Sequence, residues 1–187
     1  MAQKRKNWNG LISGFSASDL VFLDESGCNT DMTRRYAYSF GGSRTVDSTP
    51  LSKPKNTTIL SSIQLDGTLH YTTFSGGTTV ERFKRYLETD LLPHLNGNSV
   101  LIMDNMKSHH ARAVKNLLDS LGIRYIYLPP YSPDLNPIEK LWSKVKAFLR
   151  KFKARTLDAL PNAIQNAFHS VTVSDCSGWF RFCGYVL

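Results

Sequence analysis

Two short apolar runs, each ended by an aspartate, constrain the fold of this 187-residue chain more than any other feature. Asp24 follows the run Leu-Val-Phe-Leu at residues 20–23, and Asp104 ends a second run of the same kind, Val-Leu-Ile-Met. A continuous apolar run of this length that stops at a polar residue is typical of a strand buried on both faces of an α/β sheet. Open α/β sheets carry their functional sites at the carboxyl ends of such strands. We therefore expect the two carboxylates to meet at one edge of a sheet.

The remaining pattern predicts three strands, then helix, strand, helix, strand and two closing helices. The expected strands are 20–26, 57–63, 69–74, 100–103 and 123–128, with one more candidate at 36–40, and the expected helices are 78–94, 110–122, 137–151 and 156–169. Asp66-Gly67 between two β-rich runs is a strong hairpin signal. An antiparallel hairpin followed by βαβαβ is the ribonuclease-H-like arrangement, an α/β fold whose mixed sheet is flanked by helices. Right-handed crossovers then place the strand of Asp24 beside the strand of Asp104.

Composition limits the class of protein. Hydrophobic residues make up 41% of the chain, which is enough for a core, and the length fits one domain. We expect residues 1–18 to be a flexible lead-in and residues 19–187 to be the ribonuclease-H-like domain. The three cysteines form no CxxC pair, and neither a signal sequence nor a membrane-length apolar run is present. These features favour a reducing cytoplasm and give no membrane partner.

A third carboxylate, Glu139, ends the motif Leu-Pro-Pro-Tyr-Ser-Pro-Asp-Leu-Asn-Pro-Ile-Glu at residues 128–139. Asn136 has the residue type of a helix N-cap, Pro137 suits the first helical position, and Glu139 falls at the third. This capping-box pattern by itself explains a structural glutamate. A helix that starts close to the sheet edge can nevertheless point the same side chain at a metal ion.

Together, Asp24, Asp104 and Glu139 form the donor set that hard divalent cations prefer. Two Mg²⁺ ions, for which Mn²⁺ can substitute, activate the nucleophile and stabilise the leaving oxygen when a phosphodiester is cleaved. Each aspartate could instead be an ordinary turn residue, and Glu25 competes with Asp24 for the site. Asn105 and His109, just after Asp104, are candidate supporting donors.

Positive charge favours a polyanionic partner. The formal net charge is +8, from 23 Lys and Arg against 15 Asp and Glu. The expected helix after Glu139 carries a basic run that suits a DNA backbone, although a solvated helix face is the simpler explanation. The candidate DNA-binding residues are Lys140, Lys144, Lys146, Arg150 and Lys151.

Three segments resemble the catalytic domain of DDE transposases, in particular bacterial insertion-sequence transposases related to the mariner group. They are Leu-Asp-Glu-Ser-Gly at 23–27, Met-Asp-Asn at 103–105 with His109, and the long motif from 128 that runs on through Lys-Leu-Trp at 140–142. The 34 residues between Asp104 and Glu139 match the spacing of that group. The resemblance covers nearly all of residues 20–187.

This resemblance implies Mg²⁺-dependent cleavage at transposon ends, followed by transfer of the freed 3′-hydroxyl into target DNA. It implies Asp24, Asp104 and Glu139 as the catalytic triad, with Asn105, His109 and Asn136 in supporting positions. It also implies a homo-oligomer assembled on DNA, and a nucleoid-associated location in the cytoplasm. Family members carry helix-turn-helix domains before the catalytic domain, which an upstream partner or a fused reading frame is expected to supply here.

Two other functions fit the same residues. A stand-alone metal-dependent nuclease would cleave DNA without joining strands. A truncated DNA-binding remnant would regulate a full-length transposase without any chemistry.

Overall fold

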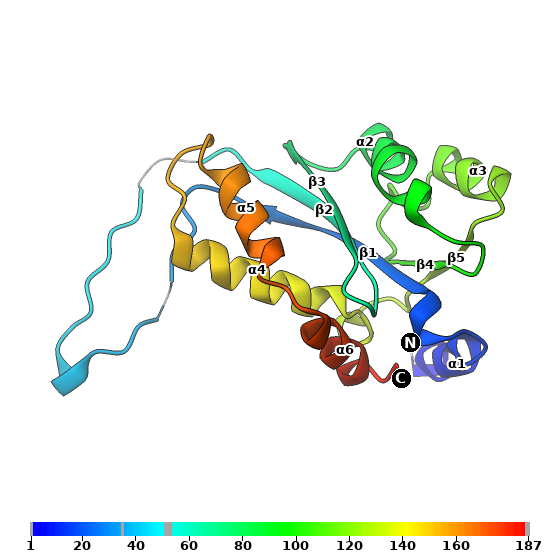
Figure 1. Ribbon diagram of the computed structural model, residues 1–187, viewed down its shortest axis with the longest axis horizontal. Helices are drawn as coiled ribbons and strands as arrows, with labels where there is room; N and C mark the ends of the chain where they lie inside the picture. Colours follow the sequence, from blue (N-terminus) through cyan, green and yellow to red (C-terminus); the bar gives the residue numbers. More distant parts are fainter. Residues whose placement is uncertain (1, 35, 51–53, 186–187) are drawn as a thin grey trace.

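A mixed five-stranded sheet with helices on both faces forms the body of the molecule (Figure 1). The structure, a computed structural model, describes residues 2–34, 36–50 and 54–185, with side chains from residue 7 onward. The strands are β1 (Leu20–Cys28), β2 (Thr57–Ile63), β3 (Leu69–Ser75), β4 (Val100–Met103) and β5 (Arg124–Tyr127). The helices are α1 (Ala2–Ile12), α2 (Val80–Tyr86), α3 (Arg112–Ser120), α4 (Ile138–Phe152), α5 (Leu160–His169) and α6 (Val173–Phe182).

The strand order confirms the predicted ribonuclease-H-like arrangement. The sheet runs β3-β2-β1-β4-β5. β2 pairs antiparallel with both β1 and β3, whereas β4 pairs parallel with both β1 and β5. The predicted hairpin joins β2 to β3, and Gly67 takes the left-handed φ of 90° that its turn requires. The strand of Asp24 therefore lies beside the strand of Asp104, as expected.

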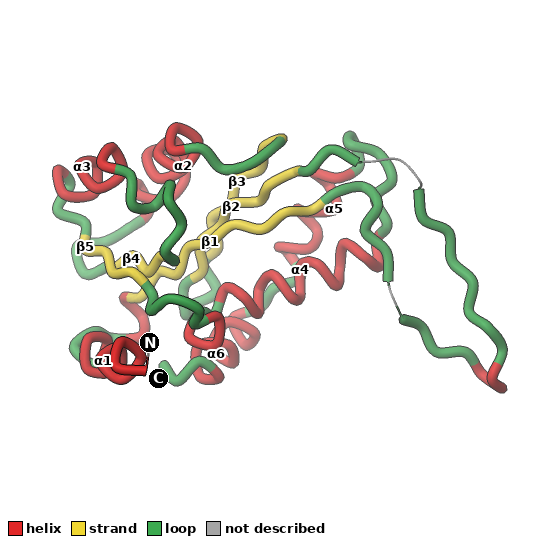
Figure 2. Tube along the Cα trace, turned by 180° about the vertical axis from the view of Figure 1, so that it is seen from behind, coloured by secondary structure: helices red, strands yellow, loops and turns green. Residues whose placement is uncertain are grey.

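The unbroken apolar runs are explained by the helices that cover both faces of the sheet. Leu20 and Phe22 pack on the side of α4, α5 and α6, while Val21 and Leu23 pack on the side of α2 and α3. The trace seen from behind shows the same two layers (Figure 2). Because both sides of β1 are covered, all four residues are buried and polar alternation is absent.

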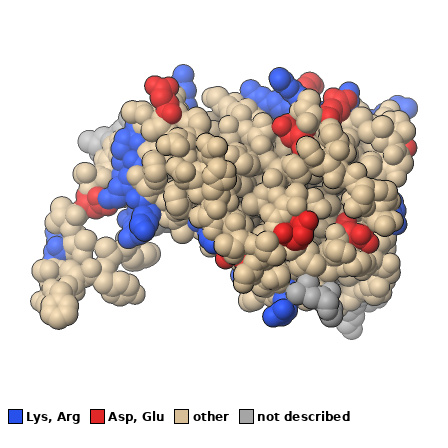
Figure 3. Space-filling view, in the orientation of Figure 1, with Lys and Arg blue, Asp and Glu red and all other residues tan. Residues whose placement is uncertain are grey.

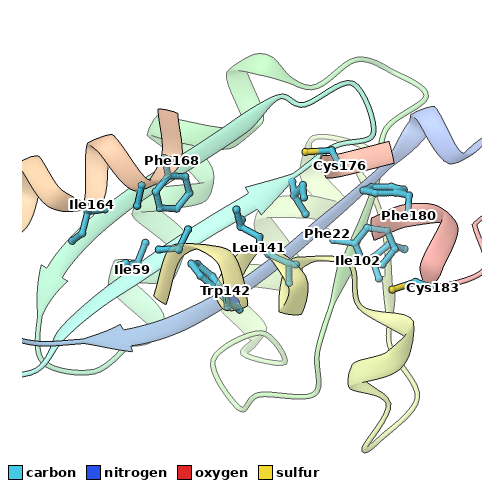
Figure 4. Packing of buried hydrophobic residues seen from close by; sticks show 14 of the residues in the cluster. Phe22, Ile59, Ile102, Leu141, Trp142, Ile164, Phe168, Cys176, Phe180 and Cys183 are labelled. Atoms are coloured by element: carbon cyan, nitrogen blue, oxygen red, sulfur yellow. The ribbon is translucent and has the colours of Figure 1, made fainter. Parts of the chain in front are cut away.

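Aromatic packing joins the sheet to the helices at the end of the chain (Figure 4). Phe22 meets Phe180 of α6 edge to face, with ring centroids 5.3 Å apart. Trp142 of α4 meets Phe168 of α5 in the same geometry at 6.5 Å. These contacts hold α4, α5 and α6 together against one face of the sheet.

Two helices were not expected from the sequence. The predicted flexible lead-in of residues 1–18 instead contains α1, whose Trp8 is buried in the main core. Helix α6 forms although its sequence contains Gly178 and two serines. A capping box between Thr172 and Asp175 starts it, and the buried side chain of Phe180 attaches it to the sheet. Tertiary packing outweighs weak helix propensity in both segments.

The boundaries of the expected helices are otherwise close to the observed ones. Thr79 caps α2 by accepting a hydrogen bond from the Arg82 N–H, as its residue type suggests. The helix expected over residues 78–94 changes into a π-turn at Leu87–Leu91 and a 3₁₀ turn at Leu92–His94, which contains a proline.

The candidate strand at residues 36–40 was wrong. This stretch belongs to an extended excursion between β1 and β2, here called the arm (residues 33–34 and 36–50), which leaves the body of the molecule (Figures 1 and 2). Tyr36, Tyr38 and Phe40 alternate as in a strand, yet each is at least 89% exposed. No described strand lies beside them to complete a ladder. At its base, Asp47 pairs with Lys153 at 2.6 Å.

We expect Phe180→Ala to lower the free energy of unfolding by about 3–5 kcal/mol, because it opens a cavity against Phe22. Phe182→Ala is the matched control on the same helix. Phe182 is 68% exposed, with the Lys140 ammonium 3.9 Å from its ring centroid, so its loss should change stability by less than about 1 kcal/mol. Urea denaturation of both variants measures the difference. Equal effects would show that α6 does not anchor on the sheet.

Candidate active site

The register of β1 and β4 brings the first two carboxylates together. Leu23 pairs with Met103 in the last step of the parallel ladder, so Asp24 and Asp104 are the next residue on each strand. Beyond this point β4 ends, while β1 continues to Cys28 along β2. The sequence had suggested that Asp24 ends its strand. In the structure it instead follows the last pair of the parallel ladder, and β1 continues beyond it.

A cavity of about 620 Å³ opens at this point of the sheet. It is lined by all three predicted carboxylates, by the predicted supporting residues Asn105 and Asn136, and by the loop of residues 128–133. Glu139 reaches it from the first turn of α4. Asp24, Asp104 and Glu139 thus line one cavity, although they are far apart in the sequence.

Asp24 is the most strongly perturbed of these acids. Burial, together with repulsion from Asp104, Glu25 and Glu139, raises its pKa from 3.8 to about 7, against the lowering effect of the Glu25 N–H. The Trp142 indole N–H donates to Asp24 Oδ2 at 3.2 Å, and the Glu25 N–H donates to Oδ1 at 2.8 Å. Without a counter-ion, this carboxyl group therefore holds its proton near neutral pH.

His109 connects Asp104 with Glu25. Its ring is fully buried, with Nδ1 2.7 Å from Asp104 Oδ1 and Nε2 3.3 Å from a Glu25 oxygen. Burial lowers the pKa of His109, but the two carboxylates outweigh this and raise it to about 9. The pKa of Asp104 shows the opposite balance: burial raises it, while His109 and the Met106 N–H lower it below its usual range. Asp104 is therefore ionised and positioned by a protonated imidazole.

Glu25 was considered from the sequence only as a competitor of Asp24. The structure places its side chain against His109, while Asp24 faces Trp142 on the opposite layer. Glu25 is 12% exposed and also borders the cavity. Strand alternation predicts the two directions, but no sequence signal identifies the His109 contact, because it joins residues 84 positions apart.

Asn105 fixes one wall of the cavity. Its side-chain amide donates to the Leu128 carbonyl at 2.6 Å, and the Leu128 N–H donates to the Met103 carbonyl at 2.8 Å. These bonds attach the loop after β5 to the end of β4. His110 stacks on Tyr127 with ring centroids 4.0 Å apart, which supports the same wall from behind.

The predicted capping box at Glu139 is absent. α4 begins at Ile138 with Pro137 in the cap position, and the buried Oδ1 of Asn136 has no hydrogen-bond partner. A 3₁₀ turn at Pro133–Leu135 precedes the helix, and Asn136 follows it in an extended conformation, with φ −112° and ψ 101°. The Asn136 carbonyl, in place of its side chain, accepts the Glu139 N–H at 3.2 Å. Glu139 is exposed and borders the cavity.

The five candidate DNA-binding residues divide between two faces of α4. At about 100° per residue, Lys146 and Arg150 lie within about 20° of Glu139 around the helix axis. They border a hollow of about 330 Å³ beside the end of β1. The other three, Lys140, Lys144 and Lys151, lie about 120° away from Glu139.

The second face of α4 is partly engaged in structural contacts. Lys144 pairs with Asp175 at 2.5 Å, and Lys140 lies 3.9 Å above the Phe182 ring. Lys151 lies at the base of the arm, where Lys and Arg side chains gather in the space-filling view (Figure 3). Of the five candidate DNA-binding residues, only Lys146 and Arg150 therefore lie on the same face of α4 as Glu139.

The three carboxylates fit a hard divalent cation by their chemistry and by their mutual repulsion. As the side chains stand, no three His, Cys, Asp or Glu residues in the described ranges are gathered tightly enough to hold an ion. Asp24 is turned toward Trp142 and Asp104 toward His109, which separates the like charges. None of the helices among the described residues has the length and apolar character to cross a membrane.

Comparison with known proteins places this geometry in a family. Residues 19–161 match the family model described as DDE superfamily endonuclease. The chain is 28% identical over 97 residues to the transposable element Tc1 transposase of Caenorhabditis elegans, covering 50% of this chain and 36% of that protein.

Solved structures share the fold. The Mos1 mariner paired-end complex with Mn superposes with a TM-score of 0.79 at 21% identity, covering 95% of this chain and 57% of that one. The Mos1 transposase catalytic domain with raltegravir and Mg gives a TM-score of 0.70 at 19% identity, covering 95% and 87%. The chain spans about a third of the Tc1 protein and just over half of the paired-end Mos1 chain.

We expect Asp24→Asn to stabilise the metal-free protein increasingly between pH 4 and pH 8. The folded state binds the Asp24 proton more tightly than the unfolded state, so wild-type stability falls as pH rises from about 4 through 7. A pKa rise from 3.8 to about 7 corresponds to at most about 4 kcal/mol. Thermal unfolding in EDTA from pH 4 to pH 8 measures the stability difference between Asp24→Asn and wild type. Asp158→Asn, at an exposed position, is the control. A pH-independent difference between wild type and Asp24→Asn would contradict the burial of this charge.

Proposed function

Because this chain belongs to the family of DDE superfamily endonucleases, we propose that it is the catalytic domain of a Tc1/mariner-type transposase. The activity proposed is metal-dependent cleavage of DNA at transposon ends, followed by strand transfer. The single observation that carries this proposal is the register of β1 and β4, which sets Asp24 and Asp104 side by side in a cavity with Glu139. The finer assignment, to bacterial insertion-sequence transposases related to mariner, is supported by the motif of residues 128–142.

Asp24, Asp104 and Glu139 would hold the metal, with Mg²⁺ as the proposed ion and Mn²⁺ as a substitute. The Mn and Mg forms of Mos1 transposase support this choice. When bound, two such ions supply activation of the attacking oxygen and stabilisation of the leaving oxygen. Hydrolysis adds the oxygen of water to phosphorus and breaks the bond to O3′, which leaves as a hydroxyl. The same hydroxyl then attacks a phosphodiester of the target DNA: its oxygen bonds to phosphorus, the target's own P–O3′ bond breaks, and the target O3′ leaves as a hydroxyl after taking up the proton.

The residues around the triad prepare it for this chemistry. His109 keeps Asp104 ionised and fixes one of its oxygens, so the other stays available for a ligand. Trp142 orients Asp24 through its indole N–H. Asn105 holds the wall formed by residues 128–133. Each of these contacts limits side-chain movement before substrate binds.

DNA is the proposed partner, and Lys146 and Arg150 are the proposed phosphate contacts. They continue the helix face that Glu139 begins, and they border the hollow next to Gly27 and Cys28. A duplex lying along this face would pass from the basic residues to the carboxylates. Assembly as a homo-oligomer on DNA and action on DNA in the cytoplasm are parts of the same proposal.

We expect Asp24→Ala, Asp104→Ala and Glu139→Ala each to lower cleavage of a transposon-end duplex in Mg²⁺ by at least about 10³-fold, because each removes a proposed metal ligand. EDTA should abolish cleavage, Mn²⁺ should restore it, and Ca²⁺ should support binding with little chemistry. The acid Asp158 lies outside the cavity, so Asp158→Asn is the control and should retain the wild-type rate. Robust cleavage in EDTA would refute the metal mechanism.

A pre-cut end with a free 3′-hydroxyl separates the candidate activities. A transposase joins this end to target DNA, whereas a stand-alone nuclease cleaves without joining. A regulatory remnant binds DNA and does neither.

We expect Lys146→Gln/Arg150→Gln to weaken DNA binding and to flatten the dependence of log K on log salt by about 2, since two phosphate contacts are lost. Lys144→Gln/Lys151→Gln removes the same charge from the other face of α4 and is the matched control. It should change the salt dependence by less than about 1, and should lower stability slightly through the lost Asp175 pair. Fluorescence anisotropy at several salt concentrations gives both slopes. Equal slopes would show that the two faces of α4 bind DNA alike.

A further inference from the structure

Tyr131 has a backbone conformation that tyrosine rarely adopts. Its φ is 55°, in the left-handed region that favours glycine. Among the described non-glycine residues, only Lys153 shares a positive φ, and there it ends α4 as an ordinary left-handed cap. Tyr131 ends no helix. Such backbone strain persists only where the surroundings impose it, and it is frequent at ligand sites.

The loop around Tyr131 holds it in place. Pro130 precedes it, and a 3₁₀ turn that starts at Pro133 follows closely, so the backbone torsions on both sides are restricted. Ser132 is buried and its hydroxyl donates to the Pro130 carbonyl at 3.3 Å. Leu128, at the start of the loop, is attached to β4 through Met103. The loop therefore presents Tyr131 in a set position.

Despite this rigid support, the tyrosine side chain is not used for packing. Tyr131 is 86% exposed and borders the cavity that contains Asp24, Asp104 and Glu139. It is the one aromatic residue among the described residues that line this cavity. The exposed aromatics of the arm, such as Tyr38, are outside it. A strained backbone that displays a ring to solvent beside a charged cavity points to a ligand with a flat apolar face.

We propose that Tyr131 stacks on the nucleobase that adjoins the phosphate held at the three carboxylates. The proposal rests on the proposed function, because DNA supplies both the phosphate and the base. A base next to the scissile phosphate lies within one nucleotide of the metal ligands, at the mouth of the same cavity. Every base has a π-face, so stacking on tyrosine tolerates any sequence. Tyr131 thereby orients the strand at the scissile bond without specifying a sequence.

The test uses a DNA duplex with 2-aminopurine, a fluorescent base, next to the phosphate at a pre-cut end. Binding is measured in Ca²⁺, so no cleavage is needed. Wild type and Tyr131→Phe should quench the fluorescence equally, because both keep the ring. Tyr131→Leu and Tyr131→Gly should abolish the quench and weaken binding by about tenfold, which corresponds to about 1.4 kcal/mol. Tyr38→Leu, an equally exposed tyrosine on the arm, is the control and should quench as wild type.

Tyr131→Gly also separates a ligand role from a structural one. Glycine adopts a positive φ without strain, and no buried contact is lost. The unfolding temperature of the Tyr131→Gly variant should therefore not fall below that of wild type. A lost quench at unchanged stability supports stacking. Wild-type quenching by Tyr131→Leu, or a quench lost only together with the fold, would overturn it.

The quenching of 2-aminopurine is measured without any cleavage of the DNA. If the wild type quenches but never cleaves in Mg²⁺, the proposed function fails while the stacking proposal stands. If cleavage and quenching both proceed normally in Tyr131→Leu, only the stacking proposal fails.

Discussion

The register of two parallel strands is the constraint on which the rest of this molecule depends. Because Leu23 is opposite Met103, Asp24 and Asp104 leave the ladder side by side. A shift of either strand by one residue would turn one carboxylate to the other face of the sheet. The buried apolar runs on both strands prevent that shift, since helices cover both faces and every side chain there is packed. Core packing therefore sets the geometry of the acidic site.

Charge in this site is balanced by protons as long as no cation is bound. Asp24 retains its proton near neutral pH, and His109 carries a charge between Asp104 and Glu25. The two aspartates therefore differ in protonation although they occupy equivalent positions on adjacent strands. A divalent cation would replace the proton on Asp24, so metal affinity should increase with pH. The imidazolium of His109 offsets part of the repulsion that would otherwise oppose folding.

The loop after β5 links the end of β4 to α4 and lines the acidic cavity between them. Asn105 and Leu128 tie it to β4, its prolines stiffen it, and it carries both the exposed Tyr131 and the buried Asn136. One segment thus forms the cavity wall, presents an aromatic ring and leads into α4. The same helix then carries Glu139 and the basic residues of its face, so that one proposed metal ligand and the proposed phosphate contacts share one rigid element.

The sequence by itself determined the features that depend on near neighbours: the buried strands, the hairpin at Gly67, and the three acids whose motifs predict a common site. Tertiary structure alone decided the contact of Glu25 with His109, the docking of α1 and α6, and the pairing of Lys144 with Asp175. The physical reason is range. Periodicity and turn chemistry act over a few residues, whereas these contacts join distant segments and arise only when the core packs. Asn136 illustrates the limit, since its residue type predicts a cap, whereas its buried side-chain oxygen makes no hydrogen bond to the start of α4.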